Sequence, residues 1–103
     1  MACKVVIIGG GAIGSAIARW LTRPEFQAAR PCQVTVLERD PTYARASSAL
    51  SASSIRQQFS TAINLAISQF GIGFLRDAAR ELGLPGQPAP AIGLHEGGYL
   101  YLA

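Results

Sequence analysis

Histidine and cysteine are scarce in this sequence of 103 residues, which holds one histidine and two cysteines. His95 alone supplies neither a metal site nor a catalytic triad. Cys3 and Cys32 have no C-x-x-C or other metal-ligand spacing. We therefore interpret both cysteines as small apolar residues in a reducing, cytoplasmic setting, and we predict no metal centre.

Long apolar runs and clustered charges are also lacking. No run reaches the roughly 18 apolar residues that a membrane-spanning helix needs. The stretch from Lys4 to Ala18 imitates a secretory signal peptide, but that interpretation does not explain the spacing of its glycines. The net charge is +3, and the nine basic residues are scattered along the chain, so we expect no nucleic-acid partner.

Glycine, by contrast, is concentrated near the N-terminus. Residues 4–8 are a strand candidate that runs into G-x-G-x-x-G, whose glycines are Gly9, Gly11 and Gly14. In this pattern the first glycine allows a tight turn, the second lets a pyrophosphate approach the backbone, and the third lets the following helix pack on the strand. We expect that helix at 12–22, with its N-terminal N–H groups and positive dipole end facing the phosphates.

A second apolar strand is predicted at 33–38 and ends in Glu38. This carboxylate follows Gly14 by 24 positions, against roughly 20 in the usual fingerprint. The extra residues fit in a loop at 22–33 that holds Pro24 and Pro31. A carboxylate at the end of this strand can accept hydrogen bonds from ribose hydroxyls, so the sequence predicts a site for an ADP-bearing dinucleotide. The alternative is a glycine-rich turn in an ordinary βαβ unit.

The chain is long enough for one domain at most. An open, doubly wound parallel sheet normally has five or six strands, whereas only three strand candidates are present. We predict an incomplete, α/β Rossmann-like domain over 1–83, followed by a linker and a first strand toward a further domain at 84–103. The alternative is a short product that pairs its open sheet edges with another chain.

The segment 39–59 is rich in serine and alanine. Composition alone favours a flexible linker at 44–54, while a tight loop with hydroxyls facing phosphate or ribose is the competing interpretation. Beyond it, apolar residues at steps of three and four predict a helix at 61–82, with a kink or close packing at Gly71 and Gly73. The alternating residues 98–103 predict a strand.

Together these segments resemble the N-terminal part of the FAD-dependent D-amino-acid oxidase superfamily, which includes enzymes oxidising glycine, sarcosine and dimethylglycine. The resemblance lies in the motif at 5–14, in Val36-Leu37-Glu38-Arg39-Asp40, and in Ser47-Ser48 leading to Ser54-Ile55-Arg56-Gln57-Gln58-Phe59. It spans nearly the whole chain and favours a cofactor loop over a linker at 39–59.

The resemblance implies a role for particular residues. The glycine turn would bind the FAD pyrophosphate, Glu38 the adenosine ribose, and Arg39 would lie at the adenine end. Ser47 and Ser48 would contact the phosphates and ribityl chain. Ser54, Ile55 and Arg56 would approach the isoalloxazine. The complete set of expected cofactor-binding residues is Gly9, Gly11, Ala12, Ile13, Gly14, Glu38, Arg39, Ser47, Ser48, Ser54, Ile55 and Arg56.

The resemblance implies the FAD-binding part of an oxidoreductase that oxidises a CH–N bond of an amino acid or N-methylated amine by hydride transfer to FAD. No histidine lies between Glu38 and Phe59, so a histidyl–flavin link in this loop is excluded. We expect this chain alone to be inactive, and the catalytic residues are not assigned. The alternatives are an NAD-dependent Rossmann dehydrogenase or reductase and a non-enzymatic subunit or interaction module.

Overall fold

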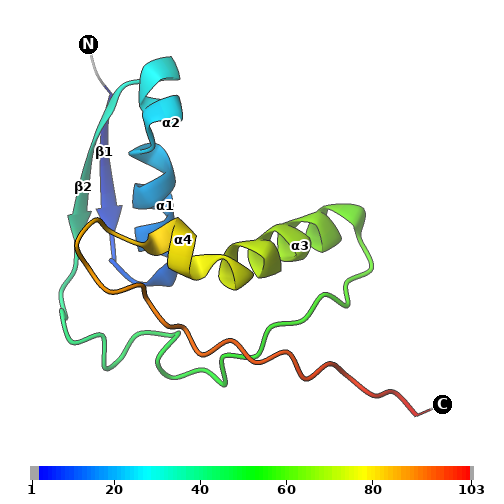
Figure 1. Cartoon of the computed structure of the whole chain (residues 1–103). Helices are drawn as coiled ribbons and strands as arrows, with labels where there is room; N and C mark the ends of the chain where they lie inside the picture. The colour runs from blue at the N-terminus through cyan, green and yellow to red at the C-terminus, as the bar shows by residue number, and fades with distance from the viewer. Residues whose placement is uncertain (1–2, 103) are drawn as a thin grey trace. The chain divides into compact units, whose positions relative to one another are not determined.

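The computed structural model describes residues 3–102. Its contacts divide the chain into two compact units, one ending at Ser54 and the other beginning at Ile55. Figure 1 shows the first unit in blue to green and the second in green to red. The predicted domain boundary at residue 83 stays a prediction.

The first unit is a parallel β-strand pair with a helical crossover. Strands β1 (Cys3–Ile8) and β2 (Cys32–Leu37) pair in parallel, with Cys3 opposite Cys32 and Ile8 opposite Leu37. Helices α1 (Ala12–Leu21) and α2 (Pro24–Ala29) connect them. Parallel strands need such a crossover, because a short turn cannot bring the chain back to the starting end. The predicted strands at 4–8 and 33–38 and the predicted helix at 12–22 agree with these elements to within one residue.

One face of the strand pair is covered by α1. Successive side chains of a strand point to opposite faces, so Val5 and Ile7 of β1 share a face with their partners Val34 and Val36 of β2. Ile7 is 8% exposed, and α1 contacts both strands. The covered face is therefore the core of this unit.

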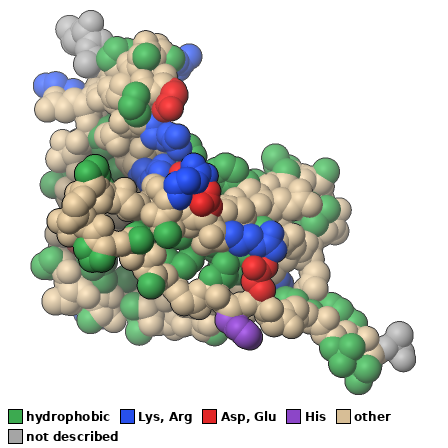
Figure 2. All heavy atoms as spheres, viewed as in Figure 1, with side chains coloured by type: hydrophobic (Ala, Val, Ile, Leu, Met, Phe, Trp, Pro, Cys, Tyr) green, Lys and Arg blue, Asp and Glu red, His purple; other side chains and the backbone are tan. Residues whose placement is uncertain are grey.

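The opposite face of the strand pair is open. Val6, Ile8 and Leu37 on that face are 60%, 88% and 55% exposed. Figure 2 shows hydrophobic side chains spread over the face of the molecule in view. Parallel sheets are normally buried on both faces. This unit thus has the parallel pairing and helical crossover of a Rossmann-like fold, with one face of its strand pair uncovered.

The predicted loop at 22–33 is wrong, because half of it is helix α2. Proline is well tolerated at the first helical position, where its missing N–H has no helical partner, and Pro24 begins α2 in this way. Gln27 then joins three elements: its Nε2 donates to the carbonyls of Leu21 at 2.6 Å and Cys32 at 3.0 Å, and its Oε1 accepts from the Cys32 N–H at 3.1 Å. Pro24, predicted to lie in a loop, is instead the first residue of a helix.

The second unit contains α3 (Ala62–Arg76) and α4 (Ala78–Leu82). The single helix predicted at 61–82 is wrong in its continuity. The break falls at Asp77, whose carbonyl accepts from the Arg80 and Glu81 N–H groups while its carboxylate pairs with Arg80. Aspartate favours such helix ends over helix interiors. Gly71 and Gly73 lie inside α3, so the kink expected there is not where the helix breaks.

The strand predicted at 98–103 is also wrong over its described part. Residues 98–102 belong to no sheet, and Ala103 lies outside the described residues. A strand needs a partner for its N–H and C=O groups, and no described segment supplies one here. Instead, side chains hold this segment: the Tyr101 hydroxyl donates to Gln58 Oε1 at 2.6 Å, and the Tyr99 and Tyr101 rings stack.

Candidate cofactor-binding site

Two of the motif glycines are required by the fold of the chain itself. Gly9 leaves β1 with φ +101, a conformation that residues with a side chain rarely adopt. A Cβ on Gly14 would lie 1.9 Å from the Gly9 carbonyl oxygen and 3.2 Å from Ile7 Cγ2. Gly14 therefore lets α1 lie directly on the turn and on β1, as the sequence predicted.

Gly11 differs from the other two glycines because nothing in the chain requires it. Its φ is −67, and a Cβ there would have no atom within 4 Å. Gly11 is the N-cap of α1, and no side chain caps that helix. The first-turn N–H groups of a helix have no partner within the helix. The open space at Gly11 thus lies at a helix end that favours anions.

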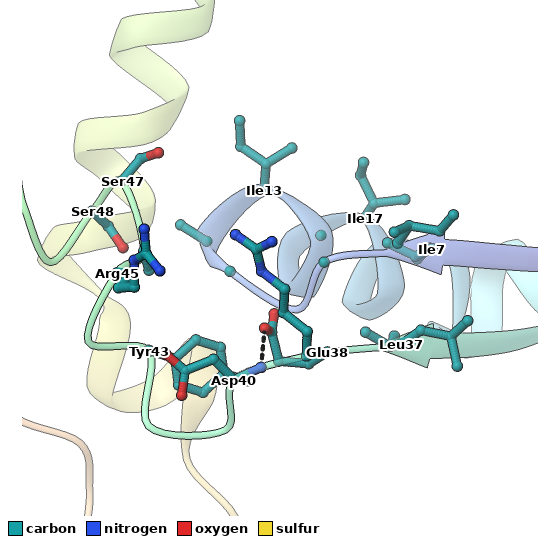
Figure 3. A pocket seen from close by; sticks show the side chains of 18 of the residues that line it. Ile7, Ile13, Ile17, Leu37, Glu38, Asp40, Tyr43, Arg45, Ser47 and Ser48 are labelled. Atoms are coloured by element: carbon teal, nitrogen blue, oxygen red, sulfur yellow. Dashed lines mark hydrogen bonds between the residues drawn. The ribbon is translucent and has the colours of Figure 1, made fainter.

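Glu38 lies at the same end of the sheet as the glycine turn. Its Oε2 accepts a hydrogen bond from the Gly10 N–H at 2.7 Å. Its Oε1 accepts one from the Asp40 N–H at 2.8 Å, the bond drawn as a dashed line in Figure 3. The sequence predicted this neighbourhood, because the carboxyl ends of adjacent parallel strands meet at one edge. Each carboxylate oxygen can accept a second hydrogen bond, so the group still has capacity for ribose hydroxyls.

The two backbone bonds fix the charge of Glu38. The Asp40 N–H, followed by the Gly10 N–H, lowers the pKa of this carboxyl below 4.5. Hydrogen bonds to the charged form of an acid favour ionisation. Glu38 is therefore an anion at neutral pH, which suits hydroxyl groups and disfavours a phosphate in the same position.

The lowered pKa of Glu38 predicts a specific pH dependence of stability. A folded-state pKa below the unfolded value gives stability that is present above pH 4.5 and is lost as pH falls through the folded value. We expect the full-length protein and its Glu38→Gln variant to differ by a constant unfolding free energy from pH 7 to about 5, with the difference shrinking below pH 4.5. Urea unfolding followed by circular dichroism at each pH measures it. A difference that grows on acidification would contradict the carboxylate's role as acceptor.

A cavity of about 1630 Å³ extends from the glycine turn along Glu38 to the serine-rich loop. All of its lining residues belong to the first unit. Figure 3 shows Glu38, Asp40 and Tyr43 on one side of it, Ile13 and Ile17 on α1, and Arg45 with Ser47 and Ser48 on the loop. The predicted cofactor-binding residues that line it are Gly9, Gly11, Ala12, Ile13, Gly14, Glu38, Arg39, Ser47 and Ser48.

The remaining predicted residues are not part of this cavity. Ser54 does not line it, and Ile55 and Arg56 belong to the second unit. Their approach to a flavin ring stays a prediction. His95 is exposed, as Figure 2 shows for its purple side chain, and residues 3–102 contain no group of three metal-binding side chains.

Sequence reasoning missed several residues that line the cavity. Tyr43 and Arg45 are the main ones, because each adds a functional group that the motif does not include. In the sequence, Arg45 is one of the scattered basic residues. Its position in the serine-rich loop that follows the phosphate-binding motif could have indicated a role in binding. Tyr43 gave no signal, since its backbone conformation is visible only in the structure.

Comparison with known proteins identifies the family. The profile of FAD-dependent oxidoreductases matches residues 4–103. The chain belongs to the FAD-dependent oxidoreductase family. The cofactor of this family is FAD. The match therefore does not support the alternative interpretation as an NAD-dependent dehydrogenase.

Individual relatives of the chain agree with the family profile. The chain is 46% identical over 99 residues to FAD-dependent oxidoreductase domain-containing protein 1 of Xenopus laevis and of Bos taurus, which covers 96% of the chain and 20% of each relative. It is 42% identical over 81 residues to the Drosophila melanogaster homolog, covering 79% of the chain and 15% of that protein. The chain spans about a fifth of the first two relatives. No solved structure matches it.

The residues at the glycine turn fit the diphosphate-bearing half of FAD. The open space at Gly11 can receive a group that a side chain there would displace. Glu38 is ionised and still able to accept hydrogen bonds beside it.

Within residues 3–102, no helix has the length and apolar character that crossing a membrane requires.

Proposed function

We propose that this chain holds the adenosine diphosphate half of FAD in an oxidoreductase that acts on a CH–N bond. The observation that carries the proposal is the Glu38–Gly10 hydrogen bond of 2.7 Å, which sets an ionised carboxylate beside the turn whose Gly11 faces open space. A hydroxyl-bearing ribose and a diphosphate are the groups that such a pair of features recognises.

Each wall of the cavity has a separate binding task. The first-turn N–H groups of α1 would hold the pyrophosphate, since they face a gap that needs no side chain. Glu38 would accept hydrogen bonds from the ribose hydroxyls. Ser47 and Ser48 line the loop side and offer hydroxyl donors to anionic oxygens, with Arg39 and Arg45 adding positive charge. The carboxylates of Glu38 and Asp40 both accept backbone N–H groups, which reduces their repulsion of phosphate.

The substrate proposed for the complete protein is an amino acid or an N-methylated amine. When bound, FAD would accept a hydride from the carbon next to nitrogen. The chain's own contribution is to bind and orient the nucleotide. We place Ser54, Ile55 and Arg56 near the isoalloxazine, where the Arg56 guanidinium would attract a substrate carboxylate.

The two free cysteines favour a reducing compartment such as the cytoplasm.

The full-length protein should be yellow and should release FAD on denaturation. Purification followed by an absorption spectrum and chromatography of the released cofactor tests this. Anaerobic mixing with glycine, sarcosine, dimethylglycine and D-amino acids should bleach the flavin with at least one of them. A colourless protein that binds NAD would contradict the cofactor site. A yellow protein that no amine bleaches would contradict the CH–N reaction alone.

A further inference from the structure

Tyr43 has a backbone conformation that is unfavourable for its residue type. Its φ is +56, and Ser53 is the other non-glycine residue with positive φ among residues 3–102. Bulky L-residues avoid this left-handed region, which glycine and asparagine tolerate. The turn around Tyr43 is held on both sides, because its N–H donates to the Asp40 carbonyl and its own carbonyl accepts from the Ala46 N–H, both at 3.0 Å.

The Tyr43 side chain lies over a glycine that the dinucleotide motif does not specify. A Cβ on Gly10 would lie 3.3 Å from the Tyr43 hydroxyl oxygen and 3.4 Å from both Glu38 Cβ and Val36 Cγ1. Gly10 is buried and its φ is not positive. Its missing side chain therefore serves the close approach of Tyr43 and Glu38 rather than a turn conformation.

Tyr43 and Glu38 consequently form one wall of the cavity. Tyr43 is 42% exposed and lines the cavity beside Glu38 (Figure 3). Successive hydrogen bonds link the glycine turn to the turn at Tyr43. The Gly10 and Asp40 N–H groups donate to the Glu38 carboxylate, and the Tyr43 N–H donates to the Asp40 carbonyl. Strained backbone at a binding wall indicates that the side chain is positioned for a ligand, since a glycine or asparagine would adopt the same conformation at lower cost.

We propose that Tyr43 determines nucleotide-base recognition in this site, with its ring stacking on the adenine. This inference rests on the proposed FAD site. The base of a nucleotide is attached to the ribose, and Tyr43 is the aromatic residue that lines the cavity next to the proposed ribose acceptor. An aromatic face offers stacking that is stronger for a purine than for a pyrimidine. The hydrogen-bonded turn from Asp40 to Ala46 holds the ring at this wall.

Apoprotein of the full-length chain tests the proposal by titration with FAD, and with ADP and UDP as competitors. Tyr43→Asn removes the ring but suits the left-handed backbone. We expect about tenfold weaker FAD binding, the effect of losing one base–aromatic stack. The preference for ADP over UDP should fall to near unity, because both share the ribose and diphosphate. Tyr43→Phe keeps the ring and should retain the affinity and the preference. Phe26→Ala in α2, where the side chain is 39% exposed and outside the cavity, is the control and should change neither.

Each other outcome has a defined meaning. Weaker binding of ADP and UDP by the same factor in Tyr43→Asn, together with a lower melting temperature, would overturn the proposal in favour of a purely structural tyrosine. Unchanged FAD affinity in that variant would also overturn it, as would a wild type that binds FAD without competition from ADP. A wild-type protein that binds no FAD would refute the proposed function itself, and the inference with it.

Discussion

Gly14→Ala strongly destabilises the nucleotide-binding unit of the full-length protein and thereby lowers its content of bound FAD. The new Cβ would lie 1.9 Å from the Gly9 carbonyl oxygen, which is backbone and has no rotamer to change. Contacts of carbon with that oxygen need more than 3 Å, so α1 has to move off β1. That movement uncovers Ile7, the buried hydrophobic residue of this unit. We expect destabilisation of about 3 kcal/mol or more, a large share of a typical domain's stability.

Gly11→Ala is the matched control, because it adds the same methyl group three positions earlier. No atom lies within 4 Å of that methyl group and the backbone has an ordinary φ, so folding should not change. Thermal denaturation monitored by circular dichroism and the flavin content after purification measure both variants. Gly11→Ala should keep the melting temperature of the wild-type apoprotein and lose FAD. Equal melting temperatures for Gly14→Ala and wild type would contradict the packing argument.

The contrast between these glycines shows how much the sequence predicted. The spacing of Gly9, Gly11 and Gly14 between two apolar strands is local information, and the turn, α1 and the position of Glu38 follow from it. The sequence assigned Gly11 to a ligand and Gly14 to packing, and the structure distinguishes the two positions in the same way through the atoms around each missing Cβ. The binding role of Gly11 stays a prediction.

Two errors concern residue types that can either interrupt a helix or begin one. Proline inside a helix breaks it, whereas proline at the first position can begin one. Pro24 begins α2, and Gln27 of that helix accepts a hydrogen bond from the Cys32 N–H. Asp77 interrupts a periodic apolar stripe at the start of the next helix, although periodicity alone predicted continuity. Both errors concern the ends of helices, where a single side-chain contact outweighs the pattern of the segment.

The remaining errors concern long-range partners, which a local pattern does not contain. Residues 98–102 alternate like a strand, but a strand exists only where another segment pairs with it. The wall formed by Tyr43 is similar, because it depends on a left-handed backbone and on the absence of a side chain at Gly10, 33 positions away. No spacing of residues in the sequence indicates either feature.

Glu38→Arg abolishes measurable retention of FAD while leaving a chain that folds, because it removes the acceptor at the centre of the site. Arginine has no hydrogen-bond acceptor, so the Gly10 and Asp40 N–H groups lose their partner at the glycine turn. The new cation also lies among Arg39 and Arg45 of the same cavity, and it offers nothing to the ribose hydroxyls. Since hydrogen bonds to a charged group are stronger than neutral ones, we expect FAD affinity to fall on the order of a hundredfold.

Glu25→Arg controls for the change of charge in this experiment. Glu25 lies in α2, its side chain is 75% exposed, it pairs with Arg23 at 3.4 Å, and it does not line the cavity. The substitution alters the net charge of the protein as Glu38→Arg does, so any long-range electrostatic effect on the FAD phosphates should be similar in both. Titration of the two apoproteins with FAD, followed by flavin fluorescence, gives the comparison. Equal affinities would show that the carboxylate at the end of β2 does not bind the ribose.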